Sequence, residues 1–192
     1  MPRSTVLLAA PLALMAGCAT APDPAPTPPP PSPAQARQAA ETAIATFEAA
    51  CLAAEDAARR EAWLTAAGYR AALAVRKGQE VATPGRQVWI GPDPAQPLAV
   101  TLRPGQADCA VLSPLGDAAA AGQAFDAMMS RHLARIAGAA TREETAAEGI
   151  LLQRSYRIPP AGAGAPAARI ELSARPVAEG RPALLIALDH PG

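Results

Sequence analysis

The sequence predicts an α+β domain, an antiparallel sheet of about five to six strands with two to three helices packed on it. Apolar residues recur every three or four positions in three segments and every second position in six others. The order of these segments along the chain is helix, helix, three strands, helix, three strands. The connections between the strands are short, which favours antiparallel pairing.

The first helix is expected to begin after Ser32. A serine followed by Pro33 and then by Gln35 is typical of a helix start, because the serine and glutamine side chains satisfy free backbone N–H groups. The inward face of this helix should carry Ala40, Ile44, Phe47 and Cys51.

Two more helices are expected further along the chain. The shorter one is capped by Asp56 and ended by Gly68, because glycine readily adopts the backbone conformation that closes a helix. The longer one covers residues 118–137, with Asp117 as its cap. Its apolar stripe consists of Phe125, Met128, Met129, Leu133 and Ile136.

Alternation with a period of two predicts six strands, at residues 87–90, 98–103, 107–112, 150–158, 168–175 and 183–188. The last strand is apolar on both sides and is therefore expected at the centre of the sheet. A type II turn is expected at Pro104–Gly105. The two halves of the domain have the pattern of a repeated helix-plus-three-strand unit, although no residues match between them.

Three further expectations concern the pair Val88 and Ile90, the side chain of Trp89, and the charged run 142–144. Val88 and Ile90 are expected on the inward face of their strand. Trp89, on the other face, is then either an exposed aromatic or packed against the second helix or a loop. The charged run 142–144 is expected to be a solvated loop or a helix fragment.

Composition excludes several classes of protein. The chain has 192 residues, of which 51 are alanines and only six are aromatic, so its core should be thin. Lys+Arg and Asp+Glu number 17 each, and this balance excludes the cationic face that a nucleic-acid binder needs. No apolar run reaches the roughly 18 residues of a transmembrane helix.

Residues 1–17 have the form of an export signal. Arg3 supplies a positive start, and residues 6–16 form a short apolar region. The following run Leu14-Met15-Ala16-Gly17-Cys18 resembles the lipobox of bacterial lipoproteins. The resemblance implies that Cys18 is lipidated, with a diacylglyceryl group and acyl chains such as palmitate, and that this anchor holds the protein in a lipid bilayer. The alternative is an ordinary signal peptide cut at a nearby small residue.

Residues 18–33 are the lipidated cysteine and a proline-rich tether. Such a segment adopts polyproline II, and 15 residues of it span roughly 45 Å. A docking peptide for a proline-binding module is the alternative interpretation. Ala19 is not the aspartate of the inner-membrane retention signal, so the outer membrane is favoured. The remaining residues, 34–192, are expected to form a single domain that faces the periplasm.

Cys51 and Cys109 are expected to form a disulfide. They remain as an even pair once Cys18 is lipidated, and an exported protein lies in an oxidising compartment. A helix packed on a sheet could bring the two together. Two cysteines 58 residues apart with no nearby histidine do not form a zinc site, so no metal ligands are assigned.

No catalytic or cofactor-binding residues are assigned. His132 lies at the edge of the apolar stripe of the long helix, and His190 follows the last strand. Neither belongs to a G-x-S-x-G or H-E-x-x-H motif, and both are expected to be solvated or at the rim of the domain.

These observations together predict a lipid-anchored, non-catalytic binding or accessory module of the cell envelope. An alanine-rich exported domain with one helix cysteine and one strand cysteine resembles uncharacterised lipoproteins of high-GC proteobacteria, a likeness that implies no activity. The expected partner is an envelope protein or a cell-wall component. An envelope hydrolase acting on cell-wall material, and a structural or assembly accessory of an envelope complex, are the alternatives.

Overall fold

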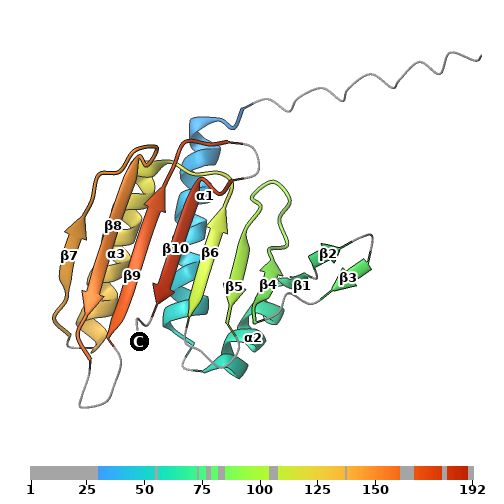
Figure 1. Cartoon of the computed structure of the whole chain (residues 1–192), viewed down its shortest axis with the longest axis horizontal. Helices are drawn as coiled ribbons and strands as arrows, with labels where there is room; N and C mark the ends of the chain where they lie inside the picture. Colours follow the sequence, from blue (N-terminus) through green and yellow to red (C-terminus); the bar gives the residue numbers. More distant parts are fainter. Residues whose placement is uncertain are drawn as a thin grey trace, which may run out of the picture. The chain divides into compact units, whose positions relative to one another are not determined.

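The structure is a computed structural model that describes residues 30–54, 56–72, 74–76, 79–81, 85–103, 108–136, 138–160, 167–178 and 181–189. Pro31 and the residues that follow it form one compact α+β unit (Figure 1). Its helical segments are α1 (Pro33–Phe47), the π-helical turn η1 (Glu48–Leu52), α2 (Ala57–Ala66) and α3 (Ala118–Ile136). Its strands are β1 (Arg70–Ala72), β2 (Ala74–Arg76), β3 (Gln79–Val81), β4 (Gln87–Ile90), β5 (Ala99–Leu102), β6 (Cys109–Ser113), β7 (Thr141–Glu144), β8 (Leu152–Ile158), β9 (Ala168–Ala174) and β10 (Leu184–Asp189).

The main sheet is antiparallel, as predicted, but it is larger than expected. It has eight strands, in the order β1-β4-β5-β6-β10-β9-β8-β7, where five to six were predicted. β10 lies at its centre between β6 and β9, which confirms the position expected from its two apolar sides. β2 and β3 form a separate two-stranded sheet.

The two unpredicted strands of the main sheet are its edges, β1 and β7. β7 contains the charged run 142–144, for which a loop or helix fragment was the wrong expectation. It pairs with β8 in the register Glu144↔Arg154, and an ion pair of 2.9 Å joins these two side chains. A strand that is exposed along its whole length has no apolar alternation to reveal it, and edge charges of this kind discourage pairing with other chains.

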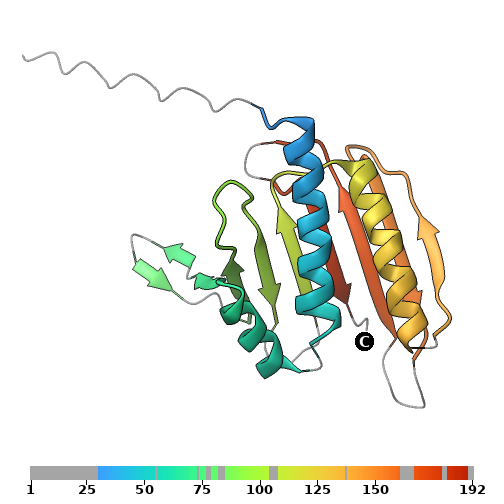
Figure 2. The same ribbon diagram turned by 180° about the vertical axis from the view of Figure 1, so that it is seen from behind.

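Helices cover one face of the main sheet (Figure 2). α1 lies across β6 and β10, and α3 lies beside α1 across β8 and β9. We call the opposite side of the sheet the open face. Among the described residues, none of the helices is long and apolar enough to span a membrane.

The helix ends follow local chemistry. The capping box of α1 is formed, because the Ser32 hydroxyl accepts from the Gln35 N–H at 3.2 Å and the Gln35 side chain accepts from the Ser32 N–H at 2.8 Å. Asp56 caps α2 and Asp117 caps α3, also as predicted. Gly68 follows α2 with a φ of +81°, a backbone conformation that favours glycine.

The first helix departs from the prediction at its end. The α-helical hydrogen bonding stops at Phe47, and the chain continues through the wider π-turn η1, which contains Cys51. The buried Arg60 of α2 donates from Nε to the Ala50 carbonyl oxygen at 3.0 Å. This bond satisfies a carbonyl of the π-turn and joins α2 to it.

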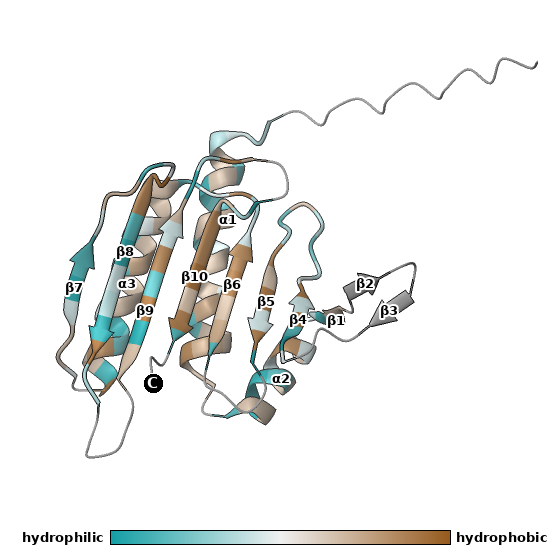
Figure 3. Ribbon diagram, viewed as in Figure 1, coloured by the Kyte–Doolittle hydropathy of each residue, from teal (hydrophilic) through white to brown (hydrophobic). Residues whose placement is uncertain are grey.

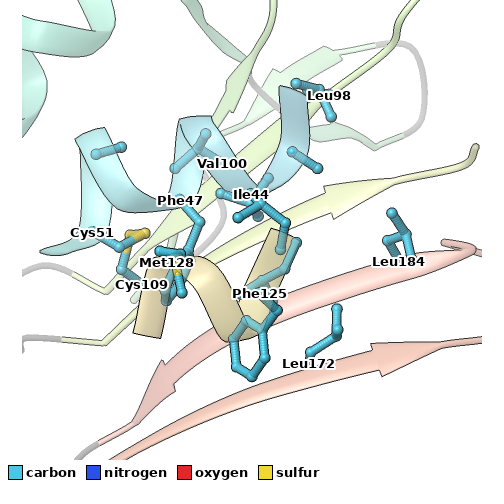
Figure 4. Packing of buried hydrophobic residues seen from close by; sticks show 14 of the residues in the cluster. Ile44, Phe47, Cys51, Leu98, Val100, Cys109, Phe125, Met128, Leu172 and Leu184 are labelled. Carbon is cyan, nitrogen blue, oxygen red and sulfur yellow. A yellow bond between two sulfur atoms is a disulfide. The ribbon is translucent and has the colours of Figure 1, made fainter. Parts of the chain in front are cut away.

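Cys51 and Cys109 form the predicted disulfide, which connects η1 to β6 (Figure 4). Their Cα atoms are 5.6 Å apart, and both residues are buried. The core around the bridge lies between the helices and the covered face of the sheet. Its largest members include Phe47, Leu64, Phe125, Met128, Met129, Ile170, Leu172 and Ile186.

The orientation of β4 is the reverse of the one expected. Trp89 pairs with Val100, a fully buried residue of the covered face, and packs against the core. Val88 and Ile90 therefore lie on the open face. Of the two interpretations left for Trp89, packing is correct, but Ile90 was wrongly expected to point inward.

Candidate functional site

The open face of the sheet is divided into an apolar and a polar part (Figure 3). Hydrophobic residues gather on β5, β6 and β10, and hydrophilic residues gather on β7, β8 and part of β9. Successive side chains of a strand point to opposite faces, so alternation identifies the residues that no helix covers. The apolar part contains a groove, which is the candidate functional site.

The floor of the groove is formed by Ile90, Ala99 and Leu112. The registers Ile90↔Ala99 and Ala99↔Leu112 place these three side chains in one row across β4, β5 and β6. The side chain of Ile90 is 42% exposed, which is unusual for a large apolar residue in a strand of the main sheet. The groove above this row has a volume of about 520 Å³.

One wall of the groove is the chain that leaves β6, with Pro114 and Leu115. The buried Ser113 fixes this segment, because its hydroxyl donates to the Leu115 carbonyl at 2.6 Å and accepts from the Leu115 N–H at 3.2 Å. Gly116 follows at a position where a Cβ atom would overlap the side chain of Leu184. The wall therefore depends on a close approach that only glycine permits.

The opposite wall is the connection between β9 and β10, with Val177, Ala178, Arg181 and Pro182. The connection is held at its base by the Arg175 N–H, which donates to the Ala183 carbonyl at 2.8 Å. Ala178 and Arg181 pair across it in an antiparallel bridge. Val177 is 51% exposed, so an apolar side chain faces solvent here as well.

The lining of the groove has a simple chemistry. Pro97 and Leu98, from the connection between β4 and β5, complete it. Among the described residues, every one that lines the groove is apolar except Arg181, which is exposed. The described lining thus offers a mostly apolar contact surface and a single positive charge, with neither a nucleophile nor a general base.

A polar cluster of Asp126, Glu144, Arg154 and Tyr156 occupies the covered side of the other half of the sheet. Arg154 Nη1 donates to Asp126 Oδ2 at 2.7 Å, and Arg154 Nε donates to Glu144 Oε2 at 3.0 Å. The Tyr156 hydroxyl donates to Asp126 Oδ1 at 3.0 Å. Burial, followed by the hydrogen bond to Asp126, raises the pKa of Tyr156. These groups bind one another, so the cluster attaches α3 to β8.

His132 is not in the groove. It lies half-buried on α3, and burial lowers its pKa below the ordinary histidine value, with the charge of Arg135 acting in the same direction and that of Glu48 in the opposite one. Glu48 is itself bound by Arg131 at 2.7 Å and by Arg135 at 3.3 Å. No group of three or more metal-ligating side chains is found in the described part of the chain.

Three of the sequence predictions fall outside the described residues. They are Cys18 with its signal peptide and the tether as far as residue 29, the turn Pro104–Gly105, and His190. The structure therefore brings together one predicted pair, Cys51 and Cys109. The residues that the sequence did not reveal are those of the groove. A surplus of apolar residues on both sides of β4 was the one signal that pointed to it.

The chain matches no protein-family model, no curated protein and no solved structure. Its function is therefore inferred from the sequence signals at its N-terminus and from the geometry of the groove.

Proposed function

We propose that this chain is a lipid-anchored protein of the bacterial cell envelope whose α+β domain is a non-catalytic binding module. Its anchor is an acylated Cys18, its domain faces the periplasm, and the outer membrane is the favoured location. Its binding site is the groove between β4–β6 and the β9–β10 connection, where it holds another component of the envelope.

The lipobox-like run that ends at Cys18 supports the location. The Cys51–Cys109 disulfide agrees with it, because such bridges form and persist in oxidising compartments outside the cytosol. Two or three acyl chains on one cysteine give a stable attachment, since every buried methylene contributes about 0.8 kcal/mol.

The apolar groove is the single observation that carries the binding function. Ile90 in the floor and Val177 in one wall are large apolar side chains that face solvent in the same groove. Exposed apolar surface that is contiguous and concave marks binding sites more often than chance exposure does. A volume of about 520 Å³ also lies within the range of roughly 300–1,000 Å³ that is usual for such sites.

The alternative of an envelope hydrolase receives no support from this site. Hydrolysis needs a nucleophile or an activated water beside a base, and a buried group with a strongly shifted pKa is its usual sign. The part of the lining that the structure describes consists of aliphatic residues, prolines and Arg181.

The location is tested by Cys18→Ser. We expect this variant to leave the membrane fraction and to appear soluble in the periplasm, because it has no acyl chains. Intact-mass analysis of the parent chain should show cleavage before Cys18 and the added lipid. An unprocessed, unacylated parent chain in the cytosol would contradict the proposal.

The binding site is tested by photo-crosslinking in cells, with a diazirine amino acid at position 177. We expect a defined adduct there. The matched control is position 136, since Ile136 is 46% exposed but lies at the end of α3, outside the groove. Equal crosslinking at both positions, or none at position 177, would contradict a groove-based function. An adduct that is always one large assembly would support the role of an assembly accessory.

A further inference from the structure

We propose that the groove binds one acyl chain of an anionic membrane phospholipid, with the phosphate at Arg181. This inference rests on the proposed function, because it assumes that the groove is a binding site, and it goes beyond that function by naming the ligand.

The lining selects the kind of ligand. An extended peptide carries one N–H and one C=O group per residue, and these groups need hydrogen-bond partners when they leave water. Among its described residues, the groove offers such a ligand no polar side chain except Arg181. The backbone groups of Ile90, Ala99 and Leu112 belong to strands that already pair within the sheet. A methylene chain has no polar groups to satisfy and gains from the apolar contact.

The lining also selects the shape of the ligand. Its described residues include no aromatic ring, so they offer no surface for the stacking of a planar ligand or for the usual recognition of proline-rich segments. Its branched aliphatic side chains and prolines suit a flexible, narrow chain.

Arg181 determines the charge of the ligand. It is the one charged residue among the described residues of the lining, and it lies at the rim, on the connection that the Ala178–Arg181 bridge holds in place. A guanidinium group binds a phosphate through two parallel hydrogen bonds. An amphiphile with an apolar tail and an anionic phosphate therefore matches both parts of the site.

The position of the groove favours a membrane lipid as this amphiphile. The groove lies at the end of the sheet where α1 begins. Two hydrogen bonds mark this position: the Asp117 N–H donates to the Ala36 carbonyl at 3.2 Å, and the Thr42 hydroxyl donates to Gln96 Oε1 at 3.2 Å. Gln96 directly precedes the groove residue Pro97, and Asp117 lies two residues after the groove residue Leu115. The tether predicted before Pro33 leads into α1 at this end, so the proposed anchor attaches the chain to a bilayer through the end of the domain that carries the groove.

The test is native mass spectrometry of the full exported chain that carries Cys18→Ser, so that its own acyl chains cannot fill the groove. The probes are palmitoyl-oleoyl phosphatidylglycerol, the diacylglycerol with the same acyl chains, and palmitate. We expect one phosphatidylglycerol per chain, bound more tightly than either of the other two. Tighter binding of palmitate would overturn the phospholipid assignment in favour of a free fatty acid.

Two substitutions separate the parts of the site. Val177→Asp should weaken phosphatidylglycerol binding by about tenfold or more, because it places a charge in the path of the acyl chain. Arg181→Gln should weaken it by about threefold to tenfold and leave the binding of diacylglycerol unchanged. Ile136→Asp is the matched control, an exposed apolar residue outside the groove, and should bind as the parent chain does.

The outcomes distinguish this inference from the function on which it rests. No lipid binding, or equal binding by Val177→Asp and Ile136→Asp, overturns the lipid proposal. If a crosslink to an envelope protein persists at position 177 in that case, the groove is a protein-binding site and the proposed function stands. If position 177 also gives no crosslink, both proposals fail.

Discussion

The two halves of the sheet have the same plan but opposite surface chemistry. In the first half, α1 precedes the antiparallel strands β1, β4, β5 and β6. In the second half, α3 precedes β7, β8, β9 and β10. The last strands of the two halves, β6 and β10, pair at the centre. The repeated unit suggested by the sequence is thus a helix with four sheet strands, rather than three, in each half.

The strands next to the central pair show the difference. On the open face, β5 presents Ala99 and Thr101, whereas β9 presents Arg169 and Glu171, which form an ion pair of 3.2 Å. The polar half thus pairs these two charged side chains with each other. The apolar half leaves large side chains such as Ile90 facing solvent. One arrangement of strands can therefore serve as a closed surface or as a binding surface, and the residues at alternate positions decide which.

The largest expected effect is the loss of the disulfide, which lies only in the first half. Cys51→Ser or Cys109→Ser should lower the free energy of unfolding by about 4 kcal/mol, because the bridge closes a loop of 58 residues in the unfolded chain. The double variant should lose little more than either single one. Urea unfolding curves measure this. A chain that unfolds at the same urea concentration in its oxidised and reduced forms would contradict it.

A smaller effect is expected in the second half. Asp126→Ala removes the acceptor of Arg154 and Tyr156 and should cost about 1–2 kcal/mol. Glu143→Ala is the matched control, since its pair with Arg157 is long, at 3.8 Å, and both side chains are exposed, so its cost should stay below about 0.5 kcal/mol. Equal costs for the two variants would show that the cluster does not attach α3 to β8.

The same cluster predicts a loss of stability at alkaline pH. Because folding raises the pKa of Tyr156, its contribution is fully present below the unfolded value of about 10 and is lost as the pH rises through the folded value. The free energy of unfolding should therefore fall above about pH 10. Tyr156→Phe should make this fall shallower, and an unchanged slope in the variant would contradict the assignment to Tyr156.

The smallest effect on stability is expected in the groove itself. Val177→Asp changes an exposed side chain and should alter the free energy of unfolding by less than about 0.5 kcal/mol. The same variant should lose the ligand. Binding and stability are thus separated in the groove, whereas substitutions in the polar cluster of Asp126, Arg154 and Tyr156 should change stability alone. A strong loss of stability in Val177→Asp would show that the residue is part of the core.

Features that leave a signal in local pattern or in composition could be predicted from the sequence. The capping box of α1 and the extent of α3 depend on contacts within one or two turns, so Ser32, Gln35 and the apolar stripe that includes Phe125 were enough. The Cys51–Cys109 bridge followed from the even count of cysteines and the expected compartment. The central position of β10 followed from its two apolar sides.

Features that leave no signal in local pattern or composition could not be predicted. β7 is a strand only because it pairs with β8, and its exposed residues carry no periodic signal. The orientation of Trp89 depends on which side of β4 faces the helices, and alternation alone does not say this, because both sides carry large apolar residues. The groove combines Ile90, Leu115 and Val177 from three separate segments, two of them connections, so only the fold brings them together.

The central claim is that the apolar half of the open face holds a ligand in the envelope. Hydrogen–deuterium exchange of the full chain, in native envelope membranes and after extraction into detergent, tests it most directly. We expect slower exchange in the membranes at residues 91–98, 114–116, 177–178 and 181–182, the described segments of the groove walls, and no change along β7 and β8. Slower exchange confined to β7 and β8, or identical exchange in both conditions, would contradict the account.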